Sequence, residues 1–108
     1  AAQASVAVVT ICIYTQVMKF AWSERKRSLN LKQHALDFVD APSVFAGLTF
    51  TFEDDRFSYQ EQRFVTLGLL AGIPVSVVHT ETAHEIRIIS FRKATQREAR
   101  IYFSQIQD

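Results

Sequence analysis

The feature that most constrains the fold is a series of short β-forming runs in the middle of the chain. Four such runs follow one another, separated by polar or glycine-containing turns: residues 48–52, 63–70, 74–80 and 85–91. In the first run, Leu48, Phe50 and Phe52 alternate with threonines, which is typical of a strand with one buried face. Because turns as short as Ala71-Gly72 join antiparallel neighbours, the sequence predicts three or four sequential antiparallel strands.

Helices are expected on both sides of these strands. Ser23 can cap a helix that runs to about Gln33 and has Leu29 as its clearest inward residue. A short second helix is expected over residues 38–46, where Pro42 fits best in the first turn. Two helices, a set of consecutive strands and a final helix predict the α+β class.

The final helix has the clearest local signal. Thr95 and Glu98 have the spacing of a capping box, in which each side chain accepts a hydrogen bond from the backbone N–H of the other residue. The apolar residues behind this box repeat at helical spacing: Ala99, Tyr102, Phe103 and Ile106. We therefore expect this helix to pack through one apolar stripe.

Size and composition fit one small domain. The chain has 108 residues, of which 48% are hydrophobic and 12% aromatic, so it can bury a single core. The formal net charge is only +1, so any binding of nucleic acid requires a local basic cluster. The single cysteine, Cys12, cannot form an internal disulfide, which favours a reducing, cytoplasmic location. The apolar run 6–14 is too short to span a membrane.

Residues 1–17 differ from residues 18–108 because they contain no Lys, Arg, Asp or Glu. Three interpretations are open for this segment. It is an extension foreign to the natural protein, with Met18 as the natural start, or an extra β-strand, or a segment that binds or swaps with a partner. In each case we expect the functional domain to span residues 18–108.

Half of the twelve basic residues fall on the predicted strands and the last helix: Arg63, Arg87, Arg92, Lys93, Arg97 and Arg100. Strict alternation predicts that Arg63 shares a strand face with Val65, and that Arg87 shares one with Ile89 and Phe91. Guanidinium groups bind phosphate through two parallel hydrogen bonds, so such a patch suits a polyanion. The same arginines could instead pair with nearby glutamates and serve structure alone.

The three histidines differ in their surroundings. His34 follows the first predicted helix and could serve either acid–base chemistry or the helix terminus. His79 shares a strand face with valines, so packing is expected, and His84 lies in a predicted turn. Asp54-Asp55 lie in a polar loop, whereas a magnesium site needs several convergent carboxylates. We therefore expect no metal and no other cofactor.

Three ordered motifs in residues 18–108 resemble the BrnT family of ribonuclease toxins. Lys32-Gln33-His34, with the residues up to Phe38, resembles the family segment N-x-x-K-H-G-V-x-F. Residues 61–68 resemble its E-x-R-F-V-T-L-G strand, and residues 86–98 resemble its I-R-I-I-S-A-R-K-A-T-x-x-E ending. Ala35 replaces the usual glycine and Phe91 the usual alanine, so the geometry of the turn after His34 and of the last strand is in question.

The resemblance implies a RelE-like α+β fold with an antiparallel sheet, two N-terminal helices and one C-terminal helix. It also implies a metal-independent endoribonuclease that cleaves RNA and halts translation, as the toxin of a type II toxin–antitoxin system. The implied partner is a BrnA-like antitoxin, through which alone the toxin would reach operator DNA. No membrane partner is expected.

A catalytic hypothesis follows from these residues together with the resemblance. Arg63 and Arg87 would hold the phosphate, Arg92 or Lys93 would assist, and His34 would transfer protons. The main alternative is a protein-binding module without catalysis, or an inactive toxin that acts as a co-repressor. A metal-dependent nuclease is a further alternative, and it would lose activity in a chelator.

Overall fold

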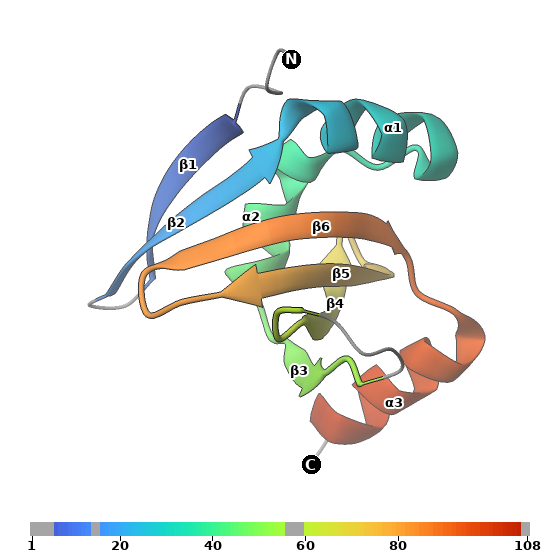
Figure 1. The fold of residues 1–108 in the computed structure, drawn as a ribbon. Helices are drawn as coiled ribbons and strands as arrows, with labels where there is room; N and C mark the ends of the chain where they lie inside the picture. The colour runs from blue at the N-terminus through green and yellow to red at the C-terminus, as the bar shows by residue number, and fades with distance from the viewer. Residues whose placement is uncertain (1–5, 14–15, 56–59, 107–108) are drawn as a thin grey trace.

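The computed structural model describes residues 6–13, 16–55 and 60–106, which form one mixed sheet with helices on both faces (Figure 1). The sheet has six strands in the order β1-β2-β6-β5-β4-β3. The strands are β1 (Val6–Ile13), β2 (Gln16–Ser23), β3 (Phe50–Glu53), β4 (Phe64–Leu70), β5 (Ile73–Glu81) and β6 (Glu85–Lys93). The helices are α1 (Glu24–His34), η1 (Phe38–Asp40), α2 (Ala41–Phe45) and α3 (Gln96–Ile106). This arrangement confirms the α+β class with two N-terminal helices and one C-terminal helix.

The expected antiparallel pairing holds for β3 to β6. Strands β1 and β2 also pair in antiparallel fashion, which was not predicted. The sheet as a whole is mixed, because β2 joins β6 in parallel through Lys19–Ala21 and Glu85–Arg87. The chain leaves β2 through α1 and returns to its side only after three further strands, so the two strands run in the same direction. Within residues 1–17, the backbone of Val6–Ile13 forms the outer strand β1, which pairs with β2.

One face of the sheet, the α2 face, is covered by η1 and α2. Its core contains Phe20, Trp22, Phe38, Val77 and Phe91, each at most 1% exposed. The strand residues of this core alternate with residues of the opposite face, as a sheet that buries apolar residues on one side requires, and Phe38 of η1 packs onto them. The α2 face is therefore a dry core.

The opposite face, the α3 face, is covered only in part. Helix α3 packs against β3, β4 and β5, with Tyr102 buried among Val65, Leu67 and Val78. The Tyr102 hydroxyl donates a hydrogen bond of 2.9 Å to the Leu48 carbonyl, which satisfies its polar end. The predicted apolar stripe is confirmed at Tyr102, but Phe103 is 39% exposed.

Two local predictions for α3 and the hairpin are confirmed. The Glu98 N–H donates to the Thr95 hydroxyl (3.1 Å) and the Thr95 N–H donates to the Glu98 carboxylate (2.9 Å), which is the expected capping box. Ala71 and Gly72 join β4 to β5 with φ angles of 50° and 80°, as a tight primed turn requires.

Helix α1 docks through an amide group, and the prediction for Leu29 was wrong. Ser23 caps the helix as expected, but Leu29 is 49% exposed and the buried residue is Asn30. The Asn30 side chain accepts from the Phe91 N–H (3.0 Å) and donates to the Phe91 carbonyl (2.7 Å). The amide thus pairs with the edge of β6 where β2 no longer does, so α1 needs no apolar stripe at this contact.

No helix among the described residues is both long and apolar enough to cross a membrane.

Candidate functional site

A β-bulge in β6 determines which face each basic side chain occupies. The register pairs Val78 with Ser90 but His79 with Ile88, so Ile89 is an extra residue in β6. The prediction that Arg87 shares a face with Phe91 was therefore wrong. Phe91 lies in the core of the α2 face, whereas Ile89 packs on the α3 face as expected.

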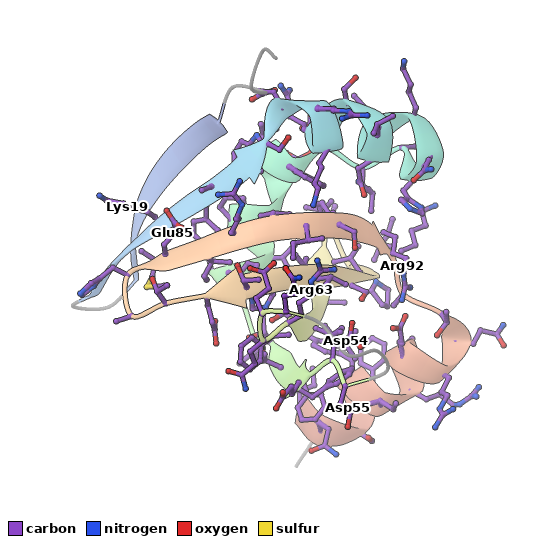
Figure 2. The ribbon with its side chains drawn as sticks, viewed as in Figure 1. Lys19, Asp54, Asp55, Arg63, Glu85 and Arg92 are labelled. Carbon is purple, nitrogen blue, oxygen red and sulfur yellow. The ribbon has the colours of Figure 1, made fainter. Side chains whose placement is uncertain are left out.

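Arg63 and Arg87 lie on the uncovered part of the α3 face, in one row across three strands. Thr80 pairs directly with Arg87, and continuing the β4–β5 register by one residue brings Arg63 beside Thr80. Strands two apart in a sheet are separated by roughly 10 Å, so both guanidinium groups can reach one bound phosphodiester. Arg87 is exposed, and the Arg63 side chain is 27% exposed with Glu61 3.8 Å away. Figure 2 shows Arg63 beside β5 and β6.

Arg92 lies further along the same face, where it binds Glu98. Its two terminal nitrogens donate to the two carboxylate oxygens at 2.8 and 2.9 Å, so it ties the end of β6 to the first turn of α3 (Figure 2). Glu98 therefore orients an arginine and also caps its helix. Although burial raises the pKa of Glu98, hydrogen bonds from Arg92 and Thr95 outweigh it and hold that pKa below its usual value.

Lys93 is separated from the other basic residues of this set. It follows Arg92 on β6 and pairs with Val75, a core residue of the α2 face. Side chains alternate along a strand, so the exposed Lys93 leaves from the side of the sheet opposite Arg87. The structure brings Arg63, Arg87 and Arg92 onto one face but does not bring Lys93 to them.

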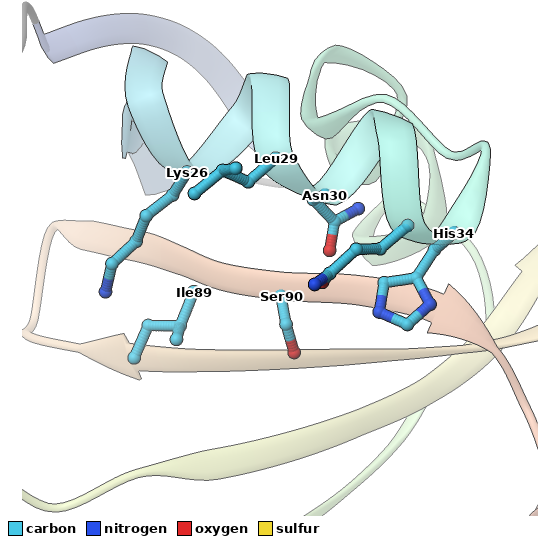
Figure 3. Close-up of a pocket in the computed structure, with 7 residues that line it drawn as sticks. Lys26, Leu29, Asn30, His34, Ile89 and Ser90 are labelled. Atoms are coloured by element: carbon cyan, nitrogen blue, oxygen red, sulfur yellow. The ribbon is translucent and has the colours of Figure 1, made fainter.

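His34 ends α1 and lines a pocket of about 240 Å³ between this helix and β6. Figure 3 shows the side chains of α1 reaching toward Ile89 and Ser90, with Lys26 at one end and His34 at the other. The next residue, Ala35, has a φ of 57° and closes the helix in the left-handed conformation usual for glycine. The turn thus keeps its shape despite the alanine, and His34 is exposed beside the face that carries Arg87.

His79 is buried and unsuited to contact with a ligand. Its Nε2 is 2.7 Å from the Thr66 hydroxyl, which is itself 2.7 Å from the Thr51 hydroxyl. Its ring packs against Phe45 and Phe64 on the α2 face. Burial lowers the pKa of His79 to about 4, so the ring is neutral at pH 7. The prediction of a packed histidine is confirmed.

Carboxylates do not assemble into a metal site in the described part of the chain, where no group of three or more His, Cys, Asp or Glu residues could hold a metal ion. Of the two aspartates considered for such a site, Asp54 is 4% exposed and its N–H donates to the Arg63 carbonyl at 2.8 Å. Asp54 therefore helps to fix the backbone that bears Arg63.

Sequence reasoning missed Gln33 and Ser90, which line the pocket beside His34. The repeated apolar pair Ile88-Ile89 interrupts the alternation of β6 and could have revealed the bulge that turns Ser90 toward this face.

Comparison with known proteins supports the resemblance. A sequence model of the family described as "Ribonuclease toxin, BrnT, of type II toxin-antitoxin system" matches residues 22–98. The chain belongs to the BrnT family. The matched segment includes His34, Arg63, Arg87, Arg92 and Lys93. A toxin of this family acts on RNA and has an antitoxin as its partner.

One solved structure that resembles this BrnT protein is the Brucella abortus ribonuclease toxin BrnT, with 26% sequence identity and a TM-score of 0.50. The similarity covers 69% of this chain and 94% of that chain. No curated protein matches the chain. The fold and the family assignment thus agree with each other.

Proposed function

We propose that this BrnT protein is a metal-independent endoribonuclease whose catalytic site is the uncovered part of the α3 face. The observation that supports the proposal most directly is the row that brings Arg63 and Arg87 to the same face of the sheet. Two guanidinium groups at this spacing can hold the non-bridging oxygens of one phosphodiester and stabilise the extra negative charge of a pentavalent transition state.

The proposed reaction is attack of a ribose 2′-OH on the adjacent phosphorus. A bond forms between the 2′-oxygen and phosphorus while the bond from phosphorus to the 5′-oxygen breaks. The products are a 2′,3′-cyclic phosphate and a free 5′-OH. One proton leaves the 2′-oxygen and one is delivered to the 5′-oxygen, so the site needs a proton-transfer group but no metal ion.

His34 is the proposed proton-transfer group. It is exposed beside the same face as Arg87, and imidazole is the side chain best suited to both accept and release a proton near neutral pH. Arg92 is a positioning residue in this proposal, because both of its terminal nitrogens already bind Glu98. Lys93 lies toward the other side of the sheet, so we propose for it at most a contact with a more distant RNA phosphate.

In the cell, this activity would cleave RNA, halt translation and be neutralised by a BrnA-like antitoxin. An antitoxin that covered the α3 face would block access of RNA to Arg87. Operator DNA would be bound only through the antitoxin, because the formal net charge of the toxin is only +1.

The test is cleavage of a defined oligoribonucleotide in the presence of EDTA. Arg63→Ala and Arg87→Ala should each lower the cleavage rate by about 10²–10³-fold, since each removes a donor to the developing charge. The free energy of unfolding of Arg87→Ala should lie within about 0.5 kcal/mol of the wild-type value, because the Arg87 side chain is exposed. The Arg63 side chain is only 27% exposed, so Arg63→Ala is assayed under conditions in which circular dichroism shows that it is folded. Mass spectrometry should detect the cyclic phosphate on the upstream fragment.

Arg25→Ala is the matched control, since Arg25 is an exposed arginine of α1 that belongs neither to the basic patch nor to the lining of the pocket. It should cleave at the wild-type rate. Wild-type rates in both the Arg63 and Arg87 variants would remove the arginine pair from the mechanism. Loss of wild-type cleavage in EDTA would contradict the metal-independent reaction, and no cleavage under any condition would favour a binding module or co-repressor.

A further inference from the structure

We propose that the pocket between α1 and β6 binds one unpaired base of the RNA substrate and thereby selects where the strand is cut. This inference rests on the proposed function, because it assumes that RNA lies across the α3 face. It adds a base-binding site to the phosphate-binding arginine pair, and His34 lines one end of that site.

The walls of the pocket suit the flat face of a base. Leu29 of α1 and Ile89 of β6 are aliphatic side chains that line opposite sides of it (Figure 3). Leu29 is 49% exposed although it is a large apolar residue on a helix that packs against the sheet. Ile89 is presented there because it is the extra residue of the bulge. Proteins commonly hold extruded bases between apolar or aromatic side chains.

The polar groups of the pocket suit the edge of a base. Gln33 offers an amide donor and an acceptor, and Ser90 offers a hydroxyl that can do either. The neighbouring Asn30 is already committed, because its nitrogen donates to the carbonyls of Leu36 and Phe91 and its oxygen accepts from the Phe91 N–H. His34, at the end of the pocket, is assigned to proton transfer under the proposed function, so discrimination among bases falls to Gln33 and Ser90.

The pocket is continuous with the phosphate-binding row. Ser90 lies three residues after Arg87 on the same face of β6, which corresponds to roughly 10 Å along a strand. At the end of the pocket nearer Arg87, Lys26 supplies a cation for a neighbouring phosphate. A single strand whose phosphate lies at Arg87 can thus place an adjacent base between α1 and β6.

Hydrogen bonds within the chain fix the walls of the pocket. The Asn30 amide fixes α1 against β6, and Arg27 donates to both carboxylate oxygens of Asp37 at 2.7 and 3.0 Å, which ties the helix to the turn that follows it. A site that is already ordered loses little conformational entropy on binding. Preorganisation of this kind favours recognition of a ligand as small as one base.

The test uses NMR titration of the ¹⁵N-labelled full chain with each of the four nucleoside 3′-monophosphates, and with ribose 5-phosphate as the probe that lacks a base. At least one nucleotide should shift the amide signals of Leu29, Gln33, Ile89 and Ser90, and ribose 5-phosphate should not. Gln33→Ala and Leu29→Ala should each weaken that nucleotide about tenfold. Arg25→Ala should leave its affinity unchanged, because Arg25 is exposed and does not line the pocket. The preference for bases beside the cut should also relax in Gln33→Ala.

Equal shifts with ribose 5-phosphate, or nucleotide shifts that spare the pocket, would overturn the inference, as would a pocket that responds only to a protein partner. The outcome is separable from that of the proposed nuclease. If the wild type cleaves RNA but the pocket ignores all four nucleotides, only the base site is wrong. If nucleotides occupy the pocket but RNA is never cleaved, the base site stands and the catalytic proposal is wrong.

Discussion

The two faces of the sheet differ in what holds them together and in what they leave free. The α2 face is dry, with Phe20, Phe38 and Phe91 fully buried and even its histidine neutral. The α3 face is apolar under α3 but carries Arg63 and Arg87 where no helix covers it. The difference teaches that this small domain builds its larger core on one face and leaves part of the other uncovered.

The largest effect should come from opening the core of the α2 face. Phe38→Ala should lower the free energy of unfolding by about 3–5 kcal/mol, because it leaves a cavity beside Trp22, whose ring centroid is 6.5 Å away. Phe103→Ala is the matched change on the α3 side, where the ring is 39% exposed, and it should cost about 1 kcal/mol. Urea denaturation measures both. Equal losses would contradict the difference between the faces.

The next effect should come from the polar attachment of α1. Asn30→Ala should cost about 2–3 kcal/mol, because it leaves the Phe91 N–H and carbonyl without these hydrogen bonds. Leu29→Ala, next to it on the half-exposed side, should cost less than about 1 kcal/mol. Chemical denaturation of the two variants compares them directly. A larger loss for Leu29 would mean that α1 docks through apolar contacts after all.

Acid should destabilise the α2 face through His79. Its pKa in the folded protein is about 4, below the value of 6.5 expected when unfolded, so the unfolded chain takes up the proton first. Stability should therefore fall as the pH drops from about 6.5 toward 4, by about 2 kcal/mol between pH 7 and pH 5. His79→Gln, measured by urea denaturation at both pH values, should lose most of this dependence. An unchanged pH dependence in that variant would assign the effect to other groups.

The smallest effect is a gain at the end of α1. Ala35→Gly should raise the free energy of unfolding by about 1 kcal/mol, because residue 35 has a φ of 57°, where a Cβ is strained. Ala46→Gly is the control, since Ala46 closes α2 with a φ of −74° and should lose stability instead. Thermal unfolding detects both signs. A loss in the Ala35 variant would show that the turn after His34 is not strained.

Much of the local structure was predictable, because its causes lie within a few residues of each other. The capping box of Thr95 and Glu98, the cap at Ser23 and the turn at Ala71-Gly72 each depend on short-range hydrogen bonds or backbone geometry. The candidate site was predictable only in part. The sequence indicated Arg63 and Arg87, and both lie on one face, but it misjudged the face of Phe91 and the direction of Leu29.

The sequence by itself determined where the helices and strands lie and which basic residues are candidates for the site, because periodicity, capping and residue type are local properties. Tertiary structure alone decided that β2 runs parallel to β6, that Arg92 rather than Lys93 shares a face with Arg87, and that an amide rather than a leucine docks α1. The physical reason is that each of these depends on a partner far along the chain. The one-residue bulge opposite β5 moves the later side chains of β6 to the other face of the sheet. The backbone of Phe91, which β2 does not pair, forms its hydrogen bonds with the Asn30 amide instead.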